Sequence, residues 1–134
     1  MSAKRLTKED IRKTTGILNP VGHVVLAFKN DSVTAEAVTA LRGLGFTERD
    51  ILAYTAEEAT PRLRERVRTA SEASGFGFEI TLMRRYLAFA ENGAGWLIVY
   101  SPSDSTTELI TRVGKRHDAL CAVRYHLLTS EDLI

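Results

Sequence analysis

The chain contains a single cysteine and no long apolar segment, and these two absences exclude several classes of protein. Cys121 has no second cysteine with which to form an internal disulfide, which fits a reducing compartment. The apolar run Trp96 to Tyr100, which no other run exceeds in length, is far shorter than the roughly 18 to 20 residues that cross a bilayer. Residues 1–13 are basic, but no apolar stretch of signal-peptide length follows them. We therefore expect a cytoplasmic protein in which Cys121 is a small buried side chain of a strand.

The motifs that mark nucleotide sites, metal sites and nucleophilic enzymes are also missing. No Gly-x-Ser-x-Gly segment is present, and Cys121 lies inside a predicted strand. Four glycines lie after one predicted helix or between two others, where they cannot form a phosphate-binding loop: Gly43, Gly45, Gly75 and Gly77. The histidines are far apart, with no cysteine or carboxylate at ligand spacing: His23, His117 and His126. We expect no catalytic residues, no cofactor and no metal site, so an enzyme is disfavoured.

The composition is that of one globular domain with a basic arm. The 134 residues are 44% apolar and 26% charged, which is enough to bury one core. Residues 1–13 carry five basic and two acidic groups (5 − 2 = +3), which leaves −2 for the rest of a chain of net charge +1. Nucleic acid is an unlikely partner, because phosphate binding needs many clustered Lys and Arg. We predict a basic arm over residues 1–19 and a single domain over residues 20–134.

Two parts of the chain, Gly22 to Ala59 and Gly95 to Leu133, repeat the same order of features. Each has an apolar run, an Asp-Ser pair (residues 31–32 and 104–105), a helical stretch, a second apolar run and an acidic end. Strand, helix and strand in each half predict an α+β fold, the split βαβ sandwich of the ferredoxin-like kind. A flavodoxin-like parallel sheet is the alternative, because one βαβ unit alone suits either fold. Ferredoxin-like folds host many unrelated functions.

Local signals place the individual elements. Thr7 and Asp10 predict a capping box for a short helix over residues 8–14. Alternating and apolar runs predict strands over residues 21–28, 50–55, 95–100 and 120–126. Helical spacing predicts one helix over residues 33–44, capped by Asp31 or Ser32, and another over 105–116 with a Ser105–Glu108 capping box.

A helical hairpin is predicted between the two halves, over residues of about 60–93. Thr60-Pro61 predicts the start of a helix that runs to residue 73, and the Gly75-Phe76-Gly77 segment separates it from a second helix over residues 79–91. Asn92-Gly93 closes the second helix. The predicted fold is therefore ferredoxin-like with a helical hairpin inserted between its halves.

Alternation along the strands predicts which side chains share a face of the sheet. One set suits a core packed by helices: Val24, Leu26, Phe28, Leu97 and Val99. The other set forms a candidate interface or ligand face, which His126 joins if the fourth strand turns it that way: His23, Val25, Trp96, Ile98, Tyr100 and His126. Such an apolar face needs a cover, either a second copy of the chain, the helical hairpin or a ligand with a flat apolar part.

Four arginines of the predicted hairpin are candidate anion contacts: Arg62, Arg66, Arg84 and Arg85. The arginines at positions 62, 64, 66 and 68 spread around more than half of their helix, with Glu65 between them. A solvated face with local pairs such as Arg68–Glu72 is the favoured interpretation. If the two helices bring these arginines together, they form a site for phosphate or an acidic partner.

The C-terminal segment resembles that of bacterial general stress proteins, including the heat-induced stress protein domain. The resemblance lies in Arg124-Tyr125-His126 followed by Ser130-Glu131-Asp132-Leu133. The first half is similar as well, with an apolar strand, a helix that ends near Gly45-Phe46, and then Asp50-Ile51. The resemblance implies a stress-linked, non-enzymatic cytoplasmic protein, and it brings no catalytic residues.

Three hypotheses about function follow. The first is a non-enzymatic stress-related or regulatory protein that buries the face bearing Trp96 by self-association, as a homodimer or higher homo-oligomer, or by binding a protein partner. The second is a small-molecule sensor or enzyme of the dimeric α+β-barrel type, with His23 and His126 as polar contacts in a cavity between the sheet and its cover. The third is an RNA-binding module that stacks bases on exposed aromatics, although its central strands carry no basic residue.

Overall fold

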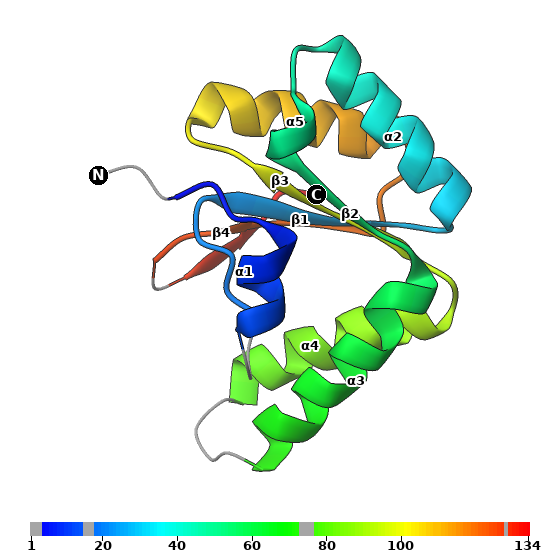
Figure 1. The fold of residues 1–134 in the computed structure, drawn as a ribbon, viewed down its shortest axis with the longest axis vertical. Helices are drawn as coiled ribbons and strands as arrows, with labels where there is room; N and C mark the ends of the chain where they lie inside the picture. Colours follow the sequence, from blue (N-terminus) through cyan, green and yellow to red (C-terminus); the bar gives the residue numbers. More distant parts are fainter. Residues whose placement is uncertain (1–3, 15–17, 73–76, 128) are drawn as a thin grey trace.

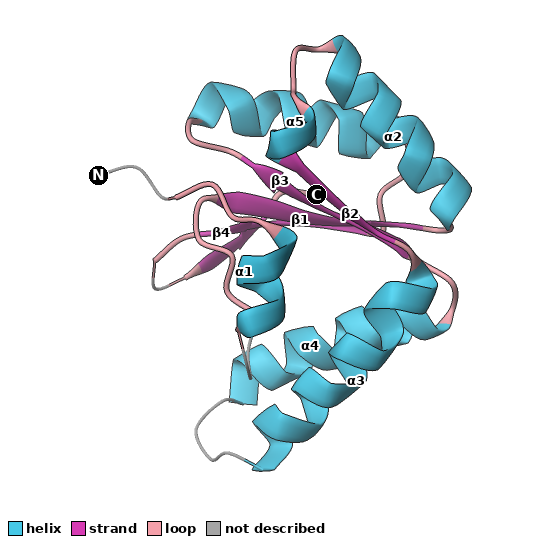
Figure 2. Ribbon diagram, viewed as in Figure 1, coloured by secondary structure: helices cyan, strands magenta, loops and turns pink. Residues whose placement is uncertain are grey.

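The computed structural model describes residues 4–14, 18–72, 77–127 and 129–134, which form an antiparallel sheet between two layers of helices (Figure 1) (Figure 2). The strands are β1 (His23–Phe28), β2 (Ile51–Tyr54), β3 (Gly95–Tyr100), β4 (Cys121–Tyr125) and β5 (Ser130–Asp132). Their order is β2-β3-β1-β4-β5, and every neighbouring pair is antiparallel. The predicted α+β class is confirmed, and the parallel flavodoxin-like alternative is wrong.

The helices cover both faces of the sheet. On one face lie α2 (Asp31–Gly43) and α5 (Asp104–Arg116), and on the other lie α1 (Lys8–Lys13), α3 (Ala56–Glu72) and α4 (Gly77–Glu91) (Figure 1). A short 3-10 helix, η1 (Glu48–Asp50), precedes β2. Among the described residues, no helix has both the length and the apolar character needed to cross a bilayer.

Two separate cores follow from the alternation of side chains along the strands. The core beneath α2 and α5 contains Val24, Leu26, Phe28, Leu97 and Val99, as the sequence predicts. The core beneath α1, α3 and α4 contains Val25, Ala27, Trp96 and Ile98. Because β1 and β3 are paired with His23 opposite Tyr100 and Ala27 opposite Trp96, the two strands present the same sets to the same faces. The cover of the Trp96 face is the helical hairpin together with α1.

The repeat between the two halves is visible in their helices. Both α2 and α5 have 13 residues, and their N-caps, Asn30 and Ser103, are 73 residues apart (103 − 30). The Asn30 side chain accepts a hydrogen bond from the Val33 N–H, and Ser103 accepts one from Thr106. The predicted caps at Asp31, Ser32 and Ser105 are therefore wrong by one or two residues, because the extended residue before each Asp-Ser pair already provides the side-chain acceptor.

The hairpin begins four residues earlier than its Thr60-Pro61 signal. Thr55 and Glu58 cap α3 reciprocally, since the Thr55 N–H donates to Glu58 Oε1 at 2.9 Å and the Glu58 N–H donates to Thr55 Oγ1 at 3.1 Å. Pro61 lies inside the helix. The predicted end of this helix at residue 73 and the break at Gly75 and Phe76 lie outside the described residues. Gly93, with φ of 95°, ends α4 as predicted.

The tight approach of β3 to α2 at Gly95 provides a test of the packing. A Cβ at Gly95 would lie 2.2 Å from Thr34 Oγ1 and 2.8 Å from Asp31 Oδ1. We expect Gly95→Ala to lower the free energy of unfolding by about 1–3 kcal/mol, because the first turn of α2 must move to admit the methyl group. Urea unfolding of the two proteins measures this difference.

Gly43→Ala is the matched control. A Cβ at Gly43, the last residue of α2, meets no atom within 4 Å, so the substitution should leave the stability unchanged or raise it by up to about 1 kcal/mol. An equal loss of stability in both variants would contradict the packing described for Gly95.

Candidate functional site

A small cavity lies between the sheet and the helices that cover the Trp96 face. Its volume is about 50 Å³, and its wall comes from α1, the three strands β1, β2 and β3, and the two helices of the hairpin. Much of the wall is aliphatic, including Ile11, Val25, Leu63 and Ile98. The lining surface is almost entirely apolar, although five of the lining residues have side chains that contain a polar atom: Tyr54, Arg62, Arg66, Tyr86 and Trp96.

Tyr54 and Trp96, which both line this cavity, carry two buried hydrogen-bond donors. They are cross-strand neighbours in β2 and β3, so both side chains point to the same face of the sheet. The Tyr54 hydroxyl and the Trp96 Nε1 are buried, and neither has a hydrogen-bond partner among the described residues. A buried donor without a partner costs about 1–3 kcal/mol. Burial raises the pKa of Tyr54, so its hydroxyl keeps its proton at neutral pH.

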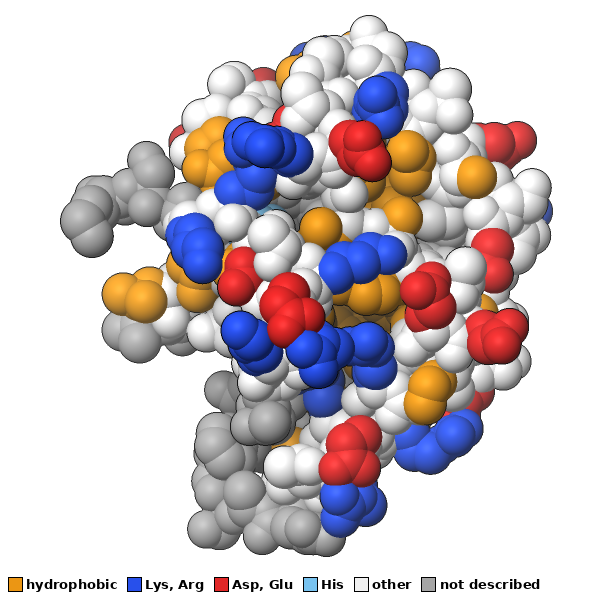
Figure 3. Space-filling model, in the orientation of Figure 1, with side chains coloured by type: hydrophobic (Ala, Val, Ile, Leu, Met, Phe, Trp, Pro, Cys, Tyr) orange, Lys and Arg blue, Asp and Glu red, His pale blue; other side chains and the backbone are white. Residues whose placement is uncertain are grey.

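Two arginines of α3 add positive charge to the same wall. Arg62 and Arg66 are four residues apart and therefore lie on one face of the helix. Arg66 is only 9% exposed, and its Nη2 donates to the Ile11 carbonyl oxygen at 3.0 Å, which joins α3 to α1. Burial lowers the pKa of Arg66, and the nearby charge of Arg62 lowers it further. On the face of the molecule that Figure 3 shows, Lys and Arg side chains lie across the middle, with Asp, Glu and apolar side chains among them.

The other predicted anion contacts lie elsewhere. Arg84 Nη2 is 3.5 Å from Ser71 Oγ, and the Arg85 guanidinium stacks over the Phe89 ring at 5.7 Å from its centroid. Arg68 pairs with Glu65, its Nε donating to Oε2 at 3.1 Å. Glu72, the predicted partner of Arg68, is not among the side chains that the structure describes. Only Arg62 and Arg66 of the four candidates therefore line the cavity.

Aromatic packing forms the inner wall of the cavity. Tyr86 of α4 meets Trp96 edge-on, with ring centroids 5.1 Å apart, and its hydroxyl is 2.9 Å from the Tyr125 hydroxyl. Burial raises the pKa of both tyrosines. These contacts hold α4 against β3 and β4, so this wall is fixed by packing on two strands.

The basic arm closes one side of the site. His23 is fully buried, and its Nε2 accepts a hydrogen bond from the Leu6 N–H at 3.1 Å. Its Nδ1 must then carry the proton that is donated to the Val21 carbonyl oxygen at 2.9 Å. Arg5 stacks over the Tyr100 ring, and Lys8 lies 4.6 Å from the centroid of the Tyr54 ring. The described part of the arm is therefore packed against the domain.

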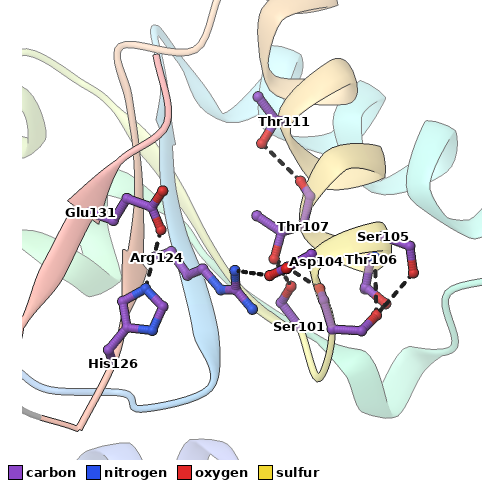
Figure 4. A network of polar contacts seen from close by, with 10 residues as sticks. Ser101, Asp104, Ser105, Thr106, Thr107, Thr111, Arg124, His126 and Glu131 are labelled. Carbon is purple, nitrogen blue, oxygen red and sulfur yellow. Dashed lines mark hydrogen bonds and ion pairs between the residues drawn. The ribbon is translucent and has the colours of Figure 1, made fainter.

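The structure separates His126 from the other residues of the predicted face. Cys121, Val123 and Tyr125 belong to the core beneath the hairpin, so the alternate residues of β4 and the adjoining His126 turn to the face of α2 and α5. His126 Nε2 is 3.1 Å from Glu131 Oε1, within a polar network that also joins Arg124 to Asp104 at 2.8 Å (Figure 4). The condition under which His126 would share a face with His23 is therefore not met.

The remaining residues of the predicted face are close to one another. Val25, Trp96 and Ile98 line the cavity. His23 and Tyr100 are in contact under the arm, with ring centroids 5.3 Å apart. Cys121 is buried, which raises the pKa of its thiol to about 12 and confirms its predicted place as a small strand side chain.

Sequence reasoning missed three groups that shape the site: Ile11, Tyr54 and Tyr86. Tyr54 lies in a predicted strand, two residues after Leu52, so both side chains point to the same face of the sheet. This spacing is the signal that could have identified Tyr54. No local signal places α1 beside α3, because these segments are far apart in the chain. Arg66 was recognised as a cation, but its burial depends on that packing.

A second groove, of about 310 Å³, lies near Tyr100, Phe46 and the start of α5. Its charged groups pair with each other, since Arg5 Nε is 3.0 Å from Asp50 Oδ1. Asp50 also accepts hydrogen bonds from the Thr47 N–H and hydroxyl. Neither of the two buried donors without partners, the Tyr54 hydroxyl and the Trp96 Nε1, belongs to a residue that lines this groove. No group of three His, Cys, Asp or Glu side chains in the described ranges is arranged to hold a metal ion.

Comparisons with protein-family models, curated proteins and solved structures found no match to this chain.

The buried His23 predicts a dependence of stability on pH. Burial is the main cause that lowers the pKa of His23 below its ordinary value of 6.5, and the charge of Arg5 lowers it further. The unfolded chain therefore binds a proton near pH 6.5, whereas the folded protein binds it only at lower pH. The free energy of unfolding should be highest above pH 6.5 and should fall as the pH decreases below that value. Urea unfolding at pH 7, 6 and 5 measures the slope.

His23→Gln should reduce this slope, because its side chain does not titrate. His117→Gln is the matched control, since His117 is only partly buried and bonds within its own helix region, to the Val113 carbonyl oxygen. The protection factor of the Leu6 amide, which corrects its exchange rate for the intrinsic dependence on pH, should fall on acidification in the parent protein. An identical pH slope in the parent protein and His23→Gln would show that His23 does not control stability.

Proposed function

We propose that this protein binds a small molecule in the cavity between Tyr54, Trp96 and α3, and that it does so without catalysing a reaction. The observation that carries the proposal is a pair of buried donors, the Tyr54 hydroxyl and the Trp96 Nε1, which have no partner among the described residues and belong to two side chains that line one cavity. A ligand acceptor within hydrogen-bond distance of either atom would satisfy it. The wall contains no Ser, Cys, His, Asp or Glu side chain among the described residues, which favours binding over catalysis.

We further infer that the fold is the ferredoxin-like split βαβ sandwich with an inserted hairpin. Two features support this inference: β3 lies between β1 and β2, while β1 lies between β3 and β4, and both connecting helices, α2 and α5, cover one face. In this arrangement the hairpin and α1 cover the other face. The cavity is therefore built within one chain, and a second subunit is not needed to complete it.

The coverage of the Trp96 face bears on the other hypotheses. Trp96 is 4% exposed, so its ring offers neither a contact surface to a second copy nor a stacking platform to bases. The hypotheses of self-association through that face and of RNA binding both assumed an exposed Trp96 ring, and its burial removes that support. The stress-related role stays an expectation from the resemblance and does not enter the proposal.

Trp96 is the only tryptophan, so its emission reports directly on the cavity. We expect that, in a panel of soluble amides, amines, carboxylates and phosphates of a few heavy atoms each, at least one class changes this emission saturably and raises Tm. Tyr54→Phe should weaken that binding about fivefold to tenfold, the effect of one lost hydrogen bond. It should also raise the free energy of unfolding by up to about 1 kcal/mol, because it removes a buried hydroxyl without a partner.

Tyr100→Phe is the matched control, because Tyr100 lies under Arg5 and does not line the cavity. It should bind the same compounds as the parent protein does. Two results would refute the proposal: a panel in which no compound alters emission or Tm, and a Tyr54→Phe variant that binds with unchanged affinity.

A further inference from the structure

The size of the cavity limits its occupant to a few heavy atoms. The cavity has a volume of about 50 Å³. A single water needs about 10–15 Å³ when its volume is measured in the same way. The occupant is therefore of the size of a short aliphatic acid, amide or alcohol. The aliphatic side chains of Ile11, Leu63 and Ile98 line the cavity and suit an apolar remainder of that size.

The polar part of the wall selects among those groups by its donors. Tyr54 and Trp96 offer an O–H and an N–H without partners among the described residues, and Arg66 adds a guanidinium. Indole and guanidinium groups donate but never accept, and the Arg66 contact with the Ile11 carbonyl already uses one backbone acceptor of this region. The NH₂ of an amide would find few acceptors there, whereas both oxygens of a carboxylate are acceptors only.

The charge of the lining side chains also favours an acceptor-only ligand over a cation. Arg62 and Arg66 both line the cavity, and Lys8 stacks on the ring of Tyr54, so a cation is repelled. Glu58 is the acidic group that acts on Tyr54, but its carboxylate accepts from the Thr55 N–H and hydroxyl at the start of α3. Phosphate brings more charge and more oxygens than these few donors satisfy.

We propose that the ligand is a small aliphatic monocarboxylate, whose oxygens accept from the Tyr54 hydroxyl and the Trp96 Nε1 beside the Arg66 guanidinium. This inference rests on the proposed function, since it names the class of molecule that the same cavity takes. The planar fork of an arginine matches the two oxygens of a carboxylate, and lysine lacks that geometry.

The test is a titration of the full chain with isobutyrate, isobutyramide, isobutylamine and inorganic phosphate at pH 7 and constant ionic strength, followed by Trp96 emission. We expect isobutyrate to bind at least tenfold more tightly than isobutyramide, and the amine and phosphate to leave emission unchanged. Isobutyramide or phosphate binding as tightly as isobutyrate overturns the carboxylate class but leaves small-molecule binding in place. If none of these compounds and none of the earlier panel binds, the carboxylate inference and the proposed function both fail.

Arg66→Lys should lower the affinity for isobutyrate at least fivefold and should leave the affinity for isobutyramide almost unchanged. Arg64→Lys is the matched control on the same helix, because Arg64 pairs with Glu91 at 3.2 Å and does not line the cavity. It should bind isobutyrate as the parent protein does. If Arg66→Lys lowers Tm, Tyr54→Phe is the second test. It should bind isobutyrate with lower affinity although its stability is not reduced. Equal isobutyrate affinity in the parent, Arg66→Lys and Tyr54→Phe proteins overturns the inference.

Discussion

The packing of α1 and the α3–α4 hairpin on the Trp96 face is the interaction on which the rest of the structure depends. An apolar strand face must be removed from water, and the aromatic side chains of Trp96 and Tyr86 bury the largest surfaces in this layer. The Tyr86–Tyr125 hydrogen bond joins the same helix to β4. The cover therefore belongs to the fold itself, and it leaves a space where Tyr54 and Trp96 lie beneath α3.

The helices that cover the Trp96 face also explain why polar groups are buried beside the cavity. The helices that bury Trp96 carry Arg66 into the wall and exclude water from the Tyr54 hydroxyl. Most buried polar groups in proteins have hydrogen-bond partners, and exceptions concentrate where a structure serves a function. The arm adds to this closure, because the Leu6–His23 hydrogen bond and the Arg66–Ile11 hydrogen bond hold it over the sheet.

The two halves of the chain share their first three elements and then diverge. After β2, Thr55 and Glu58 cap a helix, and acidic residues in its first turn favour helix formation through the helix dipole. After β4, Ser130–Asp132 instead pairs with β4 as an edge strand, with Glu131 opposite Arg124. The hairpin thus covers the sheet from one half only.

The sequence by itself determined the features that depend on neighbouring residues. Strand alternation separated Trp96 from Leu97, and the Thr7–Asp10 capping box placed α1. Only the tertiary structure decided which element covers the Trp96 face, that β4 turns His126 away from His23, and that Tyr54 and Arg66 share a cavity. Those outcomes depend on packing between segments that are tens of residues apart. Such contacts produce no periodic pattern in the local sequence.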